Sequence, residues 1–139
     1  MGRYSNDVYY SGGAYYFSTL GAAQFYFCFA EAVGRGAMVP ISNCNRTLLA
    51  DMLGTPPEAL GATSLETRYT EGLFYALLKR GDMFMAMVRT YTPASGELSE
   101  QFDQTNGAQT SAKNLAWSHA AFITAFASRK AAANTASGR

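Results

Sequence analysis

The sequence has few of the residues that build metal or redox centres. It contains one histidine, His119, and two cysteines, Cys28 and Cys44, among 139 residues. A structural zinc site takes about four such ligands at close spacing. We therefore expect no metal site and no cofactor. Both thiols are expected to be buried as small apolar side chains, and a disulfide between them is the alternative.

Charge is also scarce, and it is scattered. Only 15% of the residues are charged, the formal net charge is +1, and the eleven lysines and arginines form no basic run. Nucleic acids and anionic lipid surfaces are recognised by clustered basic residues. The sequence therefore predicts no nucleic-acid partner and no membrane partner.

Apolar and aromatic residues, in contrast, are abundant. They make up 48% and 14% of the chain, which is enough for the core of one domain. The run over 14–33, AYYFSTLGAAQFYFCFAEAV, is apolar on nearly every side. One interpretation is a membrane span, because about 20 apolar residues cross a bilayer. Gln24 and Glu31 interrupt the run and no cationic flanks bracket it, which favours a helix buried on several sides.

Two further helices are predicted in the middle of the chain. Asn43 or Asn45 is placed to cap a helix over 46–53. Apolar residues at helical spacing predict a longer helix from about residue 65 or 70 to 91. Gly81 lies inside that helix, so we expect a break or kink there.

A polar, turn-rich connection then leads to the last helix. Glu100 precedes the turn residues of 103–107, and the helix is expected over 111–128 with Trp117 one to two turns in. Residues 130–139 are small and polar and are expected to form a flexible tail. The inward face of the helix is predicted from its larger apolar residues, Leu115, Phe122 and Phe126.

Two stretches carry the most specific patterns. Residues 99–121 read SEQFDQTNGAQTSAKNLAWSHAA and place Glu100 before a loop and Trp117 after it. A carboxylate can take a proton from water, and an indole offers an apolar face and an N–H to a sugar. Taken alone, however, such a glutamate is usually solvated and such a tryptophan usually belongs to a core. Residues 2–13 read GRYSNDVYYSGG, which is typical of a loop anchored by aromatic residues.

The stretch over 99–121 resembles the segment of the glucoamylases, glycoside hydrolase family fifteen, that carries the catalytic base. In that family a Ser-Glu-Gln-Tyr-Asp run precedes Leu-Thr-Trp-Ser-Tyr-Ala-Ala. The stretch over 2–13 is similar to the family's Arg-Tyr-Pro-Glu-Asp-x-Tyr-x-Gly substrate loop. The resemblance covers the chain to about Arg129. It implies an all-α fold, the last portion of an (α/α)6 barrel of the six-hairpin glycosidase type, with 1–129 as the C-terminal part of the catalytic domain.

The same resemblance implies a reaction. It is the release of glucose from the non-reducing ends of starch-like α-glucans, with inversion. Glu100 matches the general base, Gln101 would help to hold the base or the water, and Trp117 would wall the site around the reacting sugar.

Residues of the N-terminal half complete the implied site. Arg3 would donate paired hydrogen bonds to sugar hydroxyls, Tyr4 would contact substrate, and Asp7 would hold the loop or the arginine. An Arg3–Asp7 pair that only fixes the loop is the alternative. Tyr15 stands where the family usually has a tryptophan that lines the cleft.

No stretch resembles the family's general acid, so we expect the chain to be partial and inactive alone. Its partners would be an α-glucan oligosaccharide or polysaccharide and the missing N-terminal part of the same catalytic domain. The full-length protein is expected to be secreted or periplasmic, although no signal peptide precedes Met1. Two alternatives remain open: a non-catalytic glucan-binding remnant, and a small helical interaction or membrane-associated protein.

Overall fold

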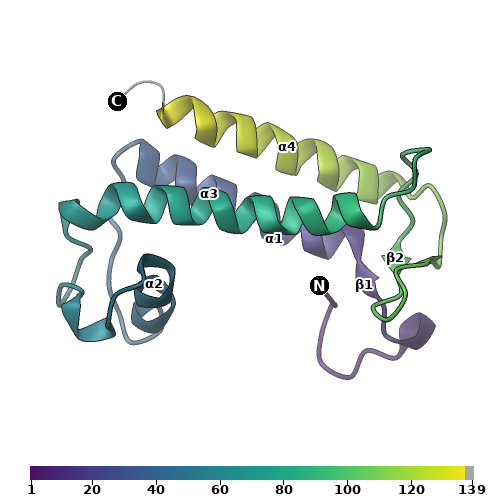
Figure 1. Cartoon of the computed structure of the whole chain (residues 1–139), viewed down its shortest axis with the longest axis horizontal. Helices are drawn as coiled ribbons and strands as arrows, with labels where there is room; N and C mark the ends of the chain where they lie inside the picture. The colour runs from purple at the N-terminus through teal and green to yellow at the C-terminus, as the bar shows by residue number, and fades with distance from the viewer. Residues whose placement is uncertain (137–139) are drawn as a thin grey trace.

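Three long helices form most of the molecule. The computed structural model describes residues 1–136, with α1 (Tyr16–Gly34), α3 (Thr67–Thr90) and α4 (Ala116–Ala136) lying side by side (Figure 1). Helix α1 packs against α3 and against α4, whereas α3 and α4 contact each other much less. The apolar residues around α1 explain this central position, because both of its neighbours bury them. Its fully buried apolar residues are Tyr16, Leu20, Ala23, Phe27, Ala30 and Val33.

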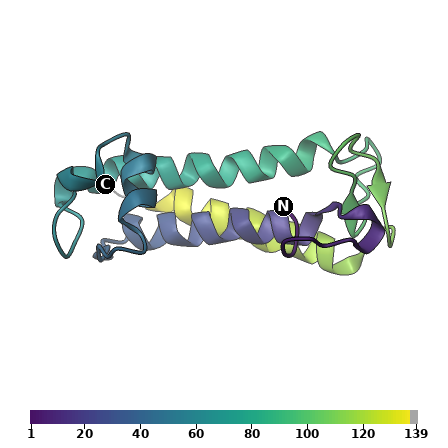
Figure 2. The same cartoon turned by 90° about the horizontal axis from the view of Figure 1, so that it is seen from below.

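Smaller elements occupy the two ends of this helical body (Figures 1 and 2). Helix α2 (Arg46–Leu53) and a short 3-10 turn (Pro57–Ala59) lie at one end. The other end carries the N-terminal segment and a three-stranded antiparallel sheet, ordered β1-β2-β3. The strands are β1 (Ala14–Tyr15), β2 (Gln101–Phe102) and β3 (Gln109–Thr110). Strands of two residues are too short to show an alternating pattern, so the sequence did not predict this sheet.

Helix α2 has the predicted bounds, but its N-terminal cap differs. Asn45 occupies the N-cap position and makes no side-chain cap hydrogen bond. Its Oδ1 accepts from the Ser42 N–H at 2.8 Å, and its Nδ2 donates to the Pro40 carbonyl at 2.8 Å. The amide therefore closes the turn before the helix. Gly54 ends the helix in the left-handed conformation, with φ 63°.

The expected break at Gly81 is absent, because α3 runs unbroken from Thr67 to Thr90. Gly81 is buried at the contact with α1. A Cβ atom placed on it would lie 2.4 Å from Cε1 of Phe27. The glycine is thus required for close packing of α1 and α3 rather than for flexibility.

Helix α4 corrects three expectations. It begins at Ala116, so Trp117 is its second residue, and it ends at Ala136. Residues 130–136 are therefore helical rather than a tail, and the rest of the expected tail, 137–139, lies outside the described residues. The predicted inward face is wrong, since Phe122 and Phe126 are exposed. The buried residues of α4 are small instead, and small side chains allow close packing against neighbouring elements: Ser118, Ala125 and Ala132.

The expectation for the cysteines is also wrong, since Cys28 and Cys44 are both free and exposed. The Cys28 thiol of α1 lies 3.7 Å from the Ser128 hydroxyl of α4, and Cys44 lies in the turn before α2. Within residues 1–136, no helix is long and apolar enough to cross a membrane. The apolar run over 14–33 is instead explained by its burial between α3 and α4.

Candidate functional site

The two sequence motifs meet at the sheet end of the molecule. Strand β1 follows the N-terminal motif and pairs with β2, with Tyr15 opposite Gln101. At the start of α1, the Tyr16 N–H donates to the Glu100 carbonyl at 3.2 Å. The pairing therefore places Glu100 beside the segment that follows the N-terminal loop, although most of the chain separates them in sequence.

The Glu100 side chain is half-buried, and two residues that directly follow β3 hold Glu100 in place by hydrogen bonds. Its Oε2 accepts a hydrogen bond from the Ser111 hydroxyl, and its N–H donates to the Ala112 carbonyl at 2.7 Å. The sequence interpretation used Ser111 only as a helix start and missed this contact. No sequence signal marked it, because the contact depends on the pairing of β2 with β3.

Buried serines fix the start of α4 against the strand that carries Glu100. The Ser118 hydroxyl donates to the Ser99 carbonyl at 2.8 Å, and the Leu115 N–H donates to the Leu98 carbonyl at 2.8 Å. These bonds fix the first turn of α4, and with it Trp117, relative to the segment that leads into Glu100.

Trp117 is exposed and belongs to a row of aromatic rings. It is 55% exposed, and its ring centroid lies 5.2 Å from that of Phe17. Phe17 in turn contacts the edge of Tyr15 at 5.2 Å. The indole therefore has one side against protein and another open to solvent, an arrangement that can accept the apolar face of a sugar.

Arg3 and Asp7 form a two-pronged ion pair in the N-terminal loop. Arg3 Nε donates to Asp7 Oδ2 at 2.8 Å, and Nη2 donates to Oδ1 at 3.0 Å. The Tyr9 N–H also donates to Asp7 Oδ1, at 3.0 Å. The hydrogen bonds from Arg3 lower the pKa of Asp7 to about 2, with a smaller contribution from Tyr9. The same pair raises the pKa of Arg3 above its usual value.

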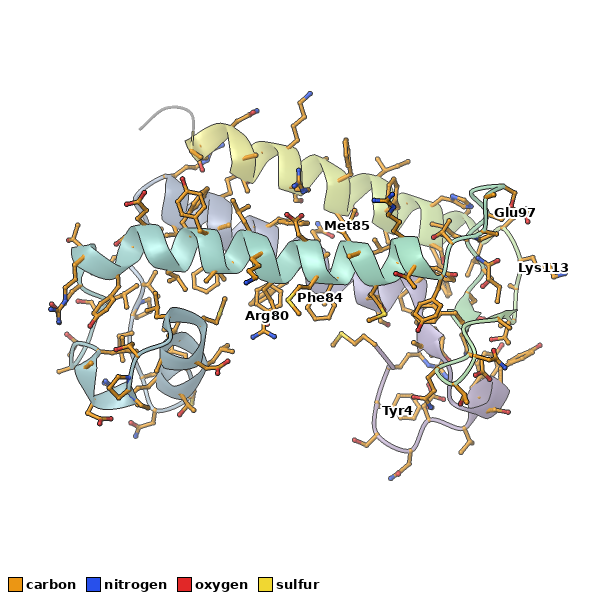
Figure 3. The ribbon with its side chains drawn as sticks, viewed as in Figure 1. Tyr4, Arg80, Phe84, Met85, Glu97 and Lys113 are labelled. Carbon is orange, nitrogen blue, oxygen red and sulfur yellow. The ribbon has the colours of Figure 1, made fainter. Side chains whose placement is uncertain are left out.

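Tyrosine rings surround the Arg3 guanidinium. Its Cζ lies 4.6 Å from the ring centroid of Tyr15, 5.1 Å from that of Tyr9 and 5.4 Å from that of Tyr4. Tyr4 projects from the N-terminal loop and is exposed (Figure 3). Tyr15 is 0% exposed, so its ring is not available at the surface. Burial raises the pKa of the Tyr15 phenol.

Gln101 lies behind the N-terminal loop rather than on Glu100. It is fully buried, and its Nε2 donates to the Tyr9 carbonyl at 3.5 Å. Adjacent residues of an extended strand point to opposite faces, which explains why Gln101 and Glu100 separate. Within residues 1–136, no hydrogen bond joins the Gln101 side chain to the Glu100 carboxylate, so the structure shows no contact by which Gln101 would hold the base. Its amide connects β2 with the N-terminal loop.

Among the cavities within residues 1–136, two lie along α3, and neither is lined by Glu100, Arg3 or Trp117. One, of about 690 Å³, lies between α3 and α4, where Met85 points (Figure 3). The other, of about 650 Å³, lies between the N-terminal segment and the side of α3 that carries Arg80 and Phe84.

Comparisons with known proteins agree with this arrangement. A family model described as glycosyl hydrolases family 15 matches residues 1–127. Glucoamylase of Neurospora crassa is 33% identical over 129 residues, which cover 93% of this chain and 20% of that protein. Glucoamylase P of Amorphotheca resinae is 32% identical over 89% of this chain and 20% of its own length. The chain thus spans about a fifth of the length of these relatives.

Solved structures give the same result. The family 15 glucoamylase of Hypocrea jecorina has a TM-score of 0.83 and 30% identity, over 94% of this chain and 21% of that one. The helices are therefore those of part of an (α/α)6 barrel, as predicted. The chain belongs to glycoside hydrolase family 15.

Proposed function

We propose that this chain is the base-carrying part of a glucoamylase-type hydrolase, which releases glucose from the non-reducing ends of starch-like α-glucans with inversion. The observation that supports this most directly is the environment of Glu100. A half-buried carboxylate is held by a serine hydroxyl on the strand end next to the start of α4, where Trp117 is exposed. This is the arrangement that a general base beside a sugar requires, in a chain that belongs to family 15.

Glu100 would act by orienting a water molecule and taking its proton. A positioned base typically contributes about 10²–10⁴ in rate. Inversion needs a second carboxyl group roughly 6.5–9.5 Å away, which protonates the leaving oxygen. Glu97 is unsuited to that role, because its carboxylate accepts from Ser95 and Asn114. The acid would come from the missing N-terminal part of the same catalytic domain.

The substrate would lie across the exposed residues of both motifs. Arg3 would donate hydrogen bonds to sugar hydroxyls, and Tyr4 would contact the sugar from the exposed side of the loop. Trp117 would line the site beside the reacting sugar ring. Asp7 would hold Arg3 in place. The longer protein would be secreted or periplasmic, where it would act on starch from the surroundings.

A graft tests the proposal. The matching fifth of the Hypocrea jecorina glucoamylase is replaced by this chain, and glucose release from soluble starch is measured. The graft should be active, and Glu100→Gln should lower its turnover by about 10²–10⁴ while sparing substrate affinity. Glu97→Gln is the matched control and should keep the parent rate. Near-parent turnover in the Glu100→Gln graft would reject Glu100 as the base.

A second candidate is glucan binding without turnover. It is favoured by the exposed aromatic side chains of both motifs, Tyr4, Tyr9 and Trp117, which can contact a sugar without Glu100. Arg3, Trp117 and the loop tyrosines would then form a glucan surface. Maltotriose binding by the chain itself, unchanged in Glu100→Gln, together with an inactive but folded graft, would favour this candidate over the first.

A further inference from the structure

Only one of the three tyrosines around Arg3 is a rigid support. Tyr4 and Tyr9 are largely exposed, whereas Tyr15 is fully buried. Tyr15 is fixed by its place in β1 opposite Gln101 and by the edge contact with Phe17. Its ring is also the nearest of the three to the guanidinium, at 4.6 Å. A cation over an aromatic face is attracted by the ring quadrupole, so the fixed Tyr15 ring holds the Arg3 guanidinium in place.

Asp7 constrains Arg3 in a different direction. The ion pair uses Nε and one hydrogen of Nη2. A guanidinium has five N–H groups, and no other hydrogen bond from Arg3 is present within residues 1–136. The outer edge, formed by Nη1 and the remaining hydrogen of Nη2, is therefore free for a ligand. Asp7 fixes the inner edge of the group, and the Tyr15 ring fixes the position of its plane.

We infer that Tyr15 is a positioning residue for Arg3. Its ring holds the guanidinium so that the free N–H edge faces outward for a pair of sugar hydroxyls, and Tyr15 does not touch the sugar. This assignment rests on the proposed function, in which Arg3 binds substrate. It replaces the expectation that Tyr15 lines the cleft, because a fully buried ring has no free face to offer.

The Arg3 Nε–H resonance tests this role in the full chain labelled with 15N-arginine. Tyr15→Phe keeps the ring, Tyr15→Leu removes it, and Tyr75→Leu changes an exposed tyrosine on α3 as a control. We expect Tyr15→Leu alone to shift the resonance and to speed its exchange with water. An unchanged resonance in Tyr15→Leu, or an equal shift in Tyr15→Phe, would overturn the inference.

A measurement on the wild-type chain keeps the test decisive if Tyr15→Leu does not fold. Cross-relaxation between the Tyr15 ring protons and the Arg3 side chain should be observed, and its absence would overturn the inference.

Maltotriose titration then separates the inference from the proposed function. Tyr15→Leu should weaken binding by about two- to fivefold, the size expected for a cation–π contact to a partly exposed guanidinium, while Tyr15→Phe should not. Equal affinity in Tyr15→Leu and wild type, in a chain where Arg3→Lys weakens binding, would overturn the positioning role. If Arg3→Lys leaves the affinity unchanged, the proposed substrate role of Arg3 fails, and the resonance of Arg3 still decides what Tyr15 does.

Discussion

Ser111 donates a hydrogen bond to Oε2 of Glu100 across eleven residues of chain. The contact exists because β2 and β3 pair and because Ser111 adopts a left-handed conformation, with φ 66°. Such a backbone conformation is uncommon for a residue with a side chain and is often associated with functional sites. The hydroxyl restricts the rotation of the carboxylate that would act as the base.

The first prediction concerns this hydrogen bond. In the active graft, Ser111→Ala should lower turnover about tenfold or more, because a hydrogen bond to a charged group is worth about 1.5–3 kcal/mol. The Michaelis constant should change little, since Ser111 is not among the residues proposed to bind substrate. Ser95→Ala removes a hydroxyl from Glu97 and serves as the control. Turnover of Ser111→Ala equal to that of Ser95→Ala would contradict the role of Ser111.

The helices could be predicted largely from the sequence, because their signals are local. Apolar spacing predicted the middle of α3, and the helix expected over 46–53 has the bounds of α2. The face of α4 could not be predicted in this way. The sequence pattern predicted that the large apolar residues face inward, but the buried residues of α4 are small, and Phe122 and Phe126 are exposed. Which face is buried depends on a neighbouring helix, and that information is not local.

The candidate site was predicted only as a set of residues. Recognition of two motifs selected Arg3, Glu100 and Trp117, and the structure brings their elements to one end of the molecule. The contacts that position these side chains depend on strands of two residues, and strands this short leave no recognisable pattern in the sequence. The pairing of β1 with β2 alone places the Tyr15 ring under the Arg3 guanidinium and turns Gln101 away from Glu100.

A second prediction concerns the contact between α1 and α3. Gly81→Ala should destabilise the chain by about 1–3 kcal/mol, because its Cβ would meet the Phe27 ring. Gly21→Ala is the matched control, since no atom lies within 4 Å of its added Cβ. That substitution should stabilise α1 by about 0.5–1 kcal/mol. Urea unfolding gives both values, and a Gly81→Ala chain as stable as Gly21→Ala would show that Phe27 can move away without cost.

A third prediction is a pH dependence of the N-terminal loop. The folded pKa of Asp7, about 2, lies below the ordinary value of about 3.9. A lowered pKa stabilises the folded state above the unfolded value, and this contribution is lost as the pH falls through the folded value. Wild type should therefore exceed Asp7→Asn in free energy of unfolding above about pH 4, and the two should converge near pH 2. A difference that stays constant from pH 6 to pH 2 would show that the Asp7 carboxylate contributes nothing through its charge.

The last prediction concerns the exposed apolar face of α4, formed by Phe122, Ile123 and Phe126. The rings of Phe122 and Phe126 stack with centroids 6.3 Å apart and border the cavity between α3 and α4. A contiguous apolar surface of this kind promotes association in water. The chain should therefore self-associate in sedimentation velocity experiments, and the double substitution Phe122→Lys and Phe126→Lys should make it monomeric. Tyr75→Lys adds a charge at an equally exposed aromatic of α3 and should leave association unchanged, so loss of association there as well would assign the effect to net charge rather than to this face.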